Sequence, residues 1–117
     1  ETGAHMDIEA SQRDNITFVR LSGRLDSPGV DRIETRFTAA VAGPGRPAAV
    51  DLSGVSFLAS MGIRMLISNA RALKQKGARM ALFGVPEPIM SVLEHVAIDQ
   101  IIPVLSTEQE AAEALRA

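Results

Sequence analysis

The sequence predicts an α/β fold, a mixed sheet with helices packed against it. Short runs of β-branched and other apolar residues alternate along the chain with segments in which apolar residues recur every three or four positions. Glycines, prolines and small polar residues separate these segments. The chain has 117 residues, 46% of them hydrophobic, which is the length and apolar content of one domain with its own core.

The first residues are set apart from the predicted domain. Residues 1–6 lack the charged and then apolar pattern of a signal peptide, and they look like a cloning remnant with the natural start near Met6 or Asp7. A single domain is therefore expected over residues 7–117.

Two strands and a helix are predicted next. Residues 7–11 are expected to form a short strand, and residues 16–21, which are rich in β-branched residues, a second one. Ser27 followed by Pro28 is typical of a helix start with serine as the N-cap. The apolar face of that helix consists of Val30, Ile33, Phe37 and Val41.

The middle of the chain predicts a central strand and the longest helix. Residues 48–52 are apolar until Asp51, as in a strand covered on both faces, and a polar loop is expected to follow. A helix is expected over residues 60–76, with Gly77 as its C-cap. Its apolar stripe consists of Ile63, Leu66, Ile67, Ala70 and Leu73.

The last part of the chain predicts two more strands and two helices. Residues 79–83 and 101–105 are expected to be strands, and residues 86–88 open a helix between them. That helix carries Ile89, Leu93 and Val96. Thr107 and Glu110 form a capping box that starts a closing helix.

The composition excludes several kinds of partner. A formal net charge of −2 and a pI near 5.6 argue against nucleic acid, which needs a basic face. No apolar run approaches the roughly 20 residues that span a bilayer, so no membrane partner is expected. The chain has no cysteine and hence no disulfide framework, and we expect a cytoplasmic protein.

Catalysis and metal binding find little support in the sequence. One of the two histidines, His5, lies in the presumed remnant, and His95 is expected on the surface of a helix. The chain has no Gly-x-Ser-x-Gly elbow, no Walker loop and no Gly-x-Gly-x-x-Gly motif. With no cysteine and one usable histidine, a transition-metal site is improbable. We therefore expect no enzyme activity, no metal and no cofactor.

The segment over residues 51–62 is the most informative part of the chain. It runs Asp-Leu-Ser-Gly-Val-Ser-Phe-Leu-Ala-Ser-Met-Gly, from the end of the predicted central strand to the start of the long helix. Ser60 is expected beside unpaired backbone N–H groups and the positive end of the helix dipole, where a phosphate is tolerated. A plain N-cap role for Ser60 remains open, and it is compatible with phosphorylation.

This segment closely resembles the signature of the STAS domain (sulfate transporter and anti-sigma factor antagonist). Ser60 matches the phosphorylated serine of the family and Gly62 the glycine after it, while Ala59 stands where many members have aspartate. The resemblance covers nearly all of residues 7–117. It implies a STAS-like fold with a mixed four- to five-stranded sheet and helices packed mainly on one side.

The resemblance also implies a function. The unphosphorylated protein is expected to act as an anti-sigma factor antagonist, which binds an anti-sigma factor of the serine-kinase type and so releases a sigma factor. The kinase then phosphorylates Ser60, and a phosphatase reverses the reaction. The alternative is a STAS scaffold or accessory subunit of a transporter or signalling complex, without phosphorylation. The sequence leaves the oligomeric state open, a homodimer included.

Three further residues are candidates for the partner-binding site. Asp26 ends a Gly-x-Leu-Asp segment that resembles a segment of the STAS family. The resemblance implies that Asp26 lies on the same rim of the domain as Ser60. Alternatively, Asp26 is an acid that interacts favourably with the dipole of the following helix. Ser53 and Ser56 are expected to satisfy loop backbone groups by local hydrogen bonds, or else to line the partner site.

The first turns of the long helix supply the remaining candidates. Met61 and Met65 lie off the predicted apolar stripe with Arg64 between them, so they are expected either in an adaptable interface with the partner or in partly buried packing. Gly62 is small enough to let a kinase or partner approach Ser60, and close helix–strand packing explains it equally well.

Overall fold

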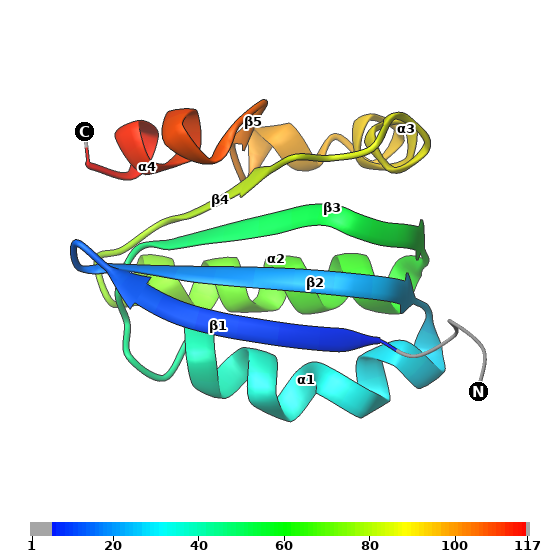
Figure 1. The fold of residues 1–117 in the computed structure, drawn as a ribbon, viewed down its shortest axis with the longest axis horizontal. Coiled ribbons are helices and arrows are strands. Elements are labelled where there is room, and N and C mark those ends of the chain that lie inside the picture. Colours follow the sequence, from blue (N-terminus) through cyan, green and yellow to red (C-terminus); the bar gives the residue numbers. More distant parts are fainter. Residues whose placement is uncertain (1–5, 117) are drawn as a thin grey trace.

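The computed structural model describes residues 6–116, which form one sheet and four α-helices. The five strands follow one another across the sheet in chain order (Figure 1). The first pair is antiparallel and the other three pairs are parallel. The strands are β1 (Asp7–Arg13), β2 (Ile16–Leu25), β3 (Ala48–Leu58), β4 (Met80–Phe83) and β5 (Val104–Leu105). The predicted α/β class and mixed sheet are confirmed.

Most helices pack on one face of this sheet. Helices α1 (Ser27–Val41) and α2 (Ser60–Gln75) contact each other there (Figure 1). Buried residues of α3 (Glu87–His95) and of the short 3₁₀ helix η1 (Ile98–Gln100) belong to the same core. Among the helices of the described residues, α4 (Glu108–Arg116) alone packs against the opposite face, beside β3 and β4. The expectation of helices mainly on one side is confirmed.

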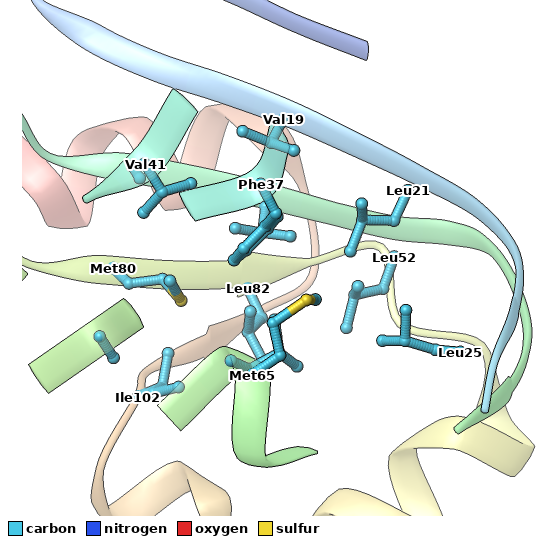
Figure 2. Close-up of a cluster of buried hydrophobic side chains, with 14 of the residues drawn as sticks. Val19, Leu21, Leu25, Phe37, Val41, Leu52, Met65, Met80, Leu82 and Ile102 are labelled. Atoms are coloured by element: carbon cyan, nitrogen blue, oxygen red, sulfur yellow. The ribbon is translucent and has the colours of Figure 1, made fainter. Parts of the chain in front are cut away.

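Alternate residues of the strands point to opposite faces of the sheet, so the buried side chains form two clusters. Figure 2 shows Phe37 of α1 close to Val19 and Val41, and Met65 of α2 near Leu82. Side chains at alternate strand positions enter a smaller cluster under α4, which contains Ile16, Ala49, Ala81, Phe83, Ala111, Ala112 and Leu115. His95, predicted on a helix surface, is exposed.

Met6 belongs to the folded domain. Its side chain is fully buried in the main core, so the expectation that residue 6 lies outside the domain is wrong. Residues 1–5, including His5, and residue 117 lie outside the described residues.

Two strand boundaries differ from the predictions. The polar loop expected after residue 52 is instead the second half of β3, which pairs with an equally extended β2 through two register irregularities. Val55 and Leu58 are buried in this half, and their burial holds the chain in the sheet. The strand expected over residues 101–105 shortens to its last two residues, because Ile98 and Ile102 turn into the core around η1.

The predicted Thr107 cap of the last helix is confirmed, while the Glu110 side chain bonds the residue before Thr107 and not Thr107 itself. The Glu110 N–H donates to the Thr107 hydroxyl oxygen over 3.1 Å, and the Glu110 carboxylate accepts from the Ser106 N–H over 3.0 Å. None of the helices within residues 6–116 is long and apolar enough to cross a membrane. No three metal-binding side chains gather anywhere in the same range.

Candidate functional site

The candidate site lies where β2 and β3 end. The two strands are parallel, so their carboxyl ends meet at the same edge of the sheet. The Ala59 N–H donates to the Leu25 carbonyl oxygen over 3.0 Å and ties the two chain segments together. Asp26 and Ser60 are each the next residue along the chain, so the structure brings these two predicted site residues to one rim.

Helix α1 begins at this rim with a capped end. The Asp26 carboxylate accepts from the Gly29 N–H over 2.9 Å, so Asp26 is the N-cap and the prediction that Ser27 is the cap is wrong. Arg24 donates from its side-chain Nε to the other oxygen of Asp26 over 3.2 Å. The Gly29 N–H first, and the Arg24 guanidinium after it, hold the pKa of Asp26 below its ordinary value of 3.8.

Helix α2 begins beside it with an open end. Ala59 is the N-cap, and its carbonyl oxygen accepts from the N–H groups of Gly62 and Ile63 over 3.0 and 3.1 Å. Ser60 is the first helical residue, it is exposed, and no side-chain hydrogen bond caps this end. The predicted N-cap role of Ser60 is therefore wrong, because the chain turns into the helix one residue earlier.

Gly62 packs against the sheet. A Cβ atom built on Gly62 would lie 2.7 Å from Leu25 Cγ and 2.8 Å from Leu58 Cδ1, and the residue is buried. This contact supports the packing explanation of Gly62, since the space next to its backbone is already occupied by two leucine side chains.

The buried face of α2 is rotated relative to the predicted stripe. Met65 is 1% exposed and lies in the main core, so of its two expected roles the structure supports packing and not the interface. Met61 is half-buried against the same core, and Arg64 is exposed. Ile63 and Ile67, predicted to be buried, are only partly covered and remain accessible at the surface.

The two serines of β3 differ in position. Both are exposed strand residues rather than loop residues. The Ser53 N–H donates to the Asp51 carboxylate over 2.9 Å. Ser53 precedes Leu58 by five residues, roughly 16 Å along an extended strand, so the structure does not bring it to Ser60. Ser56 is closer to the rim.

The similarity to known proteins fits this arrangement. The STAS domain family matches residues 7–111. The chain belongs to the STAS domain family. A relative in Paenibacillus polymyxa, an anti-sigma F factor antagonist, is 25% identical over 108 residues, which cover 92% of each chain.

Two solved structures extend the comparison. An anti-sigma factor antagonist (STAS) domain protein from Planctomyces limnophilus superposes with a TM-score of 0.81 at 30% identity, over 96% of this chain and 98% of that one. The Bacillus cell fate determinant SpoIIAA in its phosphorylated form superposes with a TM-score of 0.65 at 21% identity, over 94% of this chain and all of that one. The second likeness is one of fold.

Two residues of this STAS domain that were not predicted as site residues, Phe57 and Arg24, also lie at the rim. The Phe57 ring is 40% exposed, and the Arg24 guanidinium lies 4.2 Å from its centroid. Arg24 in turn contacts Asp26. The sequence carries one signal for Phe57, since Ser56 and Phe57 stand together between the apolar residues Val55 and Leu58, where strict alternation would bury one of them.

A groove runs from Ser60 along the exposed side of α2. We call it the α2 groove; its volume is about 570 Å³, and its lining includes Ser60, Ile63, Arg64, Ile67, Arg71 and Val96. Ser60 therefore stands both at an open helix end and at the start of a hollow with apolar and basic walls.

Proposed function

We propose that this STAS domain is an anti-sigma factor antagonist switched by phosphorylation. In its unphosphorylated form it binds an anti-sigma factor of the serine-kinase type in the cytoplasm, and a sigma factor is released. Phosphorylation of Ser60 ends the binding, and a phosphatase restores it. Family membership supports the class of protein, and the exposed Ser60 at an uncapped helix start is the observation that carries the switch.

The surroundings of Ser60 suit this chemistry. The hydroxyl oxygen of Ser60 would bond to the γ-phosphorus of ATP, ADP would leave, and the hydroxyl proton would pass to a base of the kinase. The product carries about −1.5 to −2 charges near neutral pH. The positive end of the α2 dipole and the uncapped first turn of the helix favour such a charge, so the fold should survive phosphorylation.

The same charge explains how binding would end. A partner docked over the rim formed by Asp26, Ser56, Ala59, Ser60 and Met61 must bury the phosphate or oppose it. Poorly matched charge at an interface costs several kcal/mol. A loss of about 4 kcal/mol corresponds to roughly a thousandfold in affinity. Phe57 and Arg24 add an aromatic and a charged contact, of the kinds that often dominate binding energy.

The test is phosphorylation by purified anti-sigma factor kinases of the source organism with ATP. Intact mass should show one added phosphate, and peptide mapping should assign it to Ser60. A phosphate on Ser53 or Ser56 instead would overturn the assignment of the switch residue.

A scaffold role is the second candidate, and Ala59 is the observation that favours it. An alanine stands there in place of the aspartate of many family members, and it leaves α2 without a side-chain cap. If wild type forms a stable complex but accepts no phosphate, while Ala59→Asp does, the scaffold role replaces the switch.

A further inference from the structure

The charges of α2 differ from those of the rest of the chain. Arg64, Arg71 and Lys74 all belong to this helix, and it contains no aspartate or glutamate. The whole chain has a net charge of −2, and each of the other three α-helices carries carboxylates. Within residues 6–116, none of the three basic side chains forms a salt bridge. Positive charge is therefore concentrated on one helix and is not paired with a carboxylate of the described residues.

Apolar side chains lie next to this charge. The α2 groove passes Ile63 and Ile67 and reaches Val96, which is 44% exposed. A second hollow of about 390 Å³ starts at Arg71 and extends to Ile101, which is 48% exposed. Among the described residues that line either hollow there is no carboxylate. The two hollows share Arg71 in their linings, so they adjoin at this residue, and both are apolar and basic in character.

We propose that the α2 groove receives an acidic amphipathic segment of the anti-sigma factor, a contact separate from the one at the rim. This inference rests on the proposed function. Apolar side chains of the segment would cover Ile63, Ile67 and Val96, and its carboxylates would pair with Arg64 and Arg71. These arginines are seven residues apart, roughly 10.5 Å along the helix, a spacing that acids two turns apart on a docked helix reproduce.

The shape of the surface favours a protein segment over other anionic partners. A hollow lined by isoleucine and valine is filled by apolar side chains. The phosphate backbone of a nucleic acid has no apolar side chains, and a flat lipid surface would contact only the outer edge of the groove. The two hollows together are lined by four basic residues, Arg64, Arg71, Lys74 and Arg79, which are few for nucleic acid on a chain with a net negative charge.

Ser60 connects the groove to the switch. Ser60 and Arg64 are four residues apart on α2, on the same side of the helix, and both line the groove. A phosphate on Ser60 lies within reach of Arg64 and competes there with a carboxylate of the partner. Phosphorylation would then weaken the groove contact as well as the contact at the rim.

The experiment measures the affinity of a purified anti-sigma factor of the source organism for wild type and three folded variants, by calorimetry at low and high salt. Arg71→Glu should bind at least about tenfold more weakly at low salt, with a smaller loss at high salt, because exposed charges are screened. Val96→Ser should lose about threefold at both salt concentrations, because it removes apolar contact. The control Arg36→Glu makes the same charge change at an exposed position of α1, outside the groove, and should stay within about twofold of wild type.

The outcomes separate the two proposals. If wild type binds and both groove variants match the Arg36→Glu control, the groove inference is overturned while the proposed function stands. If wild type binds none of the organism's anti-sigma factors, the proposed function fails and the groove inference with it. Binding of wild type to anionic vesicles or duplex DNA that Arg71→Glu abolishes would also overturn the choice of a protein partner.

Discussion

Helices α1 and α2 begin at the same rim with the same sequence pattern, but a carboxylate caps the start of α1 and no side chain caps the start of α2. Each starts with serine, any residue and glycine, at positions 27–29 and 60–62. Asp26 closes the first start by accepting from a backbone N–H, whereas Ala59 precedes the second and has no side-chain oxygen. The residue before the serine, and not the serine itself, decides whether the helix start is capped.

Because of this difference, the N-terminus of α1 is already occupied by a side chain of the protein, whereas the N-terminus of α2 is free to accept an added anion. The start of α1 already has its anion, held between a backbone donor and Arg24. The start of α2 has no such group, so a phosphate on Ser60 or an acceptor of a partner can take its place. Five predictions test this contrast, from the largest expected effect to the smallest.

The first prediction places a negative charge at each start. Phosphorylation of Ser60 should weaken binding of the anti-sigma factor by about a thousandfold, and Ser60→Asp, with less charge, by about ten- to a hundredfold. The free energy of unfolding of Ser60→Asp should be unchanged or up to about 1 kcal/mol higher, because the charge is near the positive end of the dipole. Calorimetry and urea unfolding measure both.

The matched control is Ser27→Asp, the equivalent change at the start of α1. It should cause a clearly smaller loss of affinity. If it weakens binding as much as Ser60→Asp does, the rim as a whole excludes charge and the contrast between the two starts has no bearing on binding.

The second prediction compares the two glycines. A Cβ atom on Gly29 would lie 2.0 Å from the Arg24 carbonyl oxygen, which is backbone, whereas on Gly62 it would meet leucine side chains. Gly29→Ala should therefore lower the free energy of unfolding by about 3 kcal/mol and Gly62→Ala by about 1 kcal/mol, because side chains can shift. Urea unfolding of both variants gives the ranking, and the reverse order would contradict it.

The third prediction exchanges the caps. Ala59→Asp should raise the free energy of unfolding by about 1 kcal/mol, because the carboxylate can cap α2 as Asp26 caps α1. Asp26→Ala should lower it. The rate of phosphorylation of Ala59→Asp should equal or exceed that of wild type. A destabilised Ala59→Asp would show that the two starts are not equivalent in geometry.

The fourth prediction concerns pH. The pKa of Asp26 is below its ordinary value of 3.8 in the folded protein, so its charge stabilises the fold above that value, and this contribution is lost as the pH falls through the lower folded pKa. The stability difference between wild type and Asp26→Asn should be constant from about pH 7 to 5 and shrink below about pH 4. Unfolding curves at three pH values measure it, and a difference that grows in acid would contradict the sign.

The last prediction is that removing the Ser60 hydroxyl hardly changes the stability of the fold. Ser60→Ala should change the free energy of unfolding by less than about 0.5 kcal/mol, because no capping bond of Ser60 is lost. It should bind the anti-sigma factor and resist inactivation by the kinase. A loss near 1 kcal/mol would indicate that Ser60 caps α2 after all.

Local patterns in the sequence predicted much of this molecule. The α/β class, the four helices and the Thr107 cap follow from periodicity and from the residues at helix ends, which act over a few neighbouring positions. The location of Ser60 and Asp26 on one rim was expected from the resemblance to the family, and the parallel pairing of β2 and β3 is its physical reason.

The tertiary structure alone decided the details of the site. The sequence of the second half of β3 predicts a polar loop. In the structure this segment is a strand paired with β2, because the pairing buries Val55 and Leu58. The same packing buries Met65, exposes Phe57 and leaves Ile63 and Ile67 beside the basic residues of α2. Which side of a helix is covered depends on neighbours distant in sequence, so the sequence determined where a serine could be presented, and the packing of the sheet determined what surrounds it.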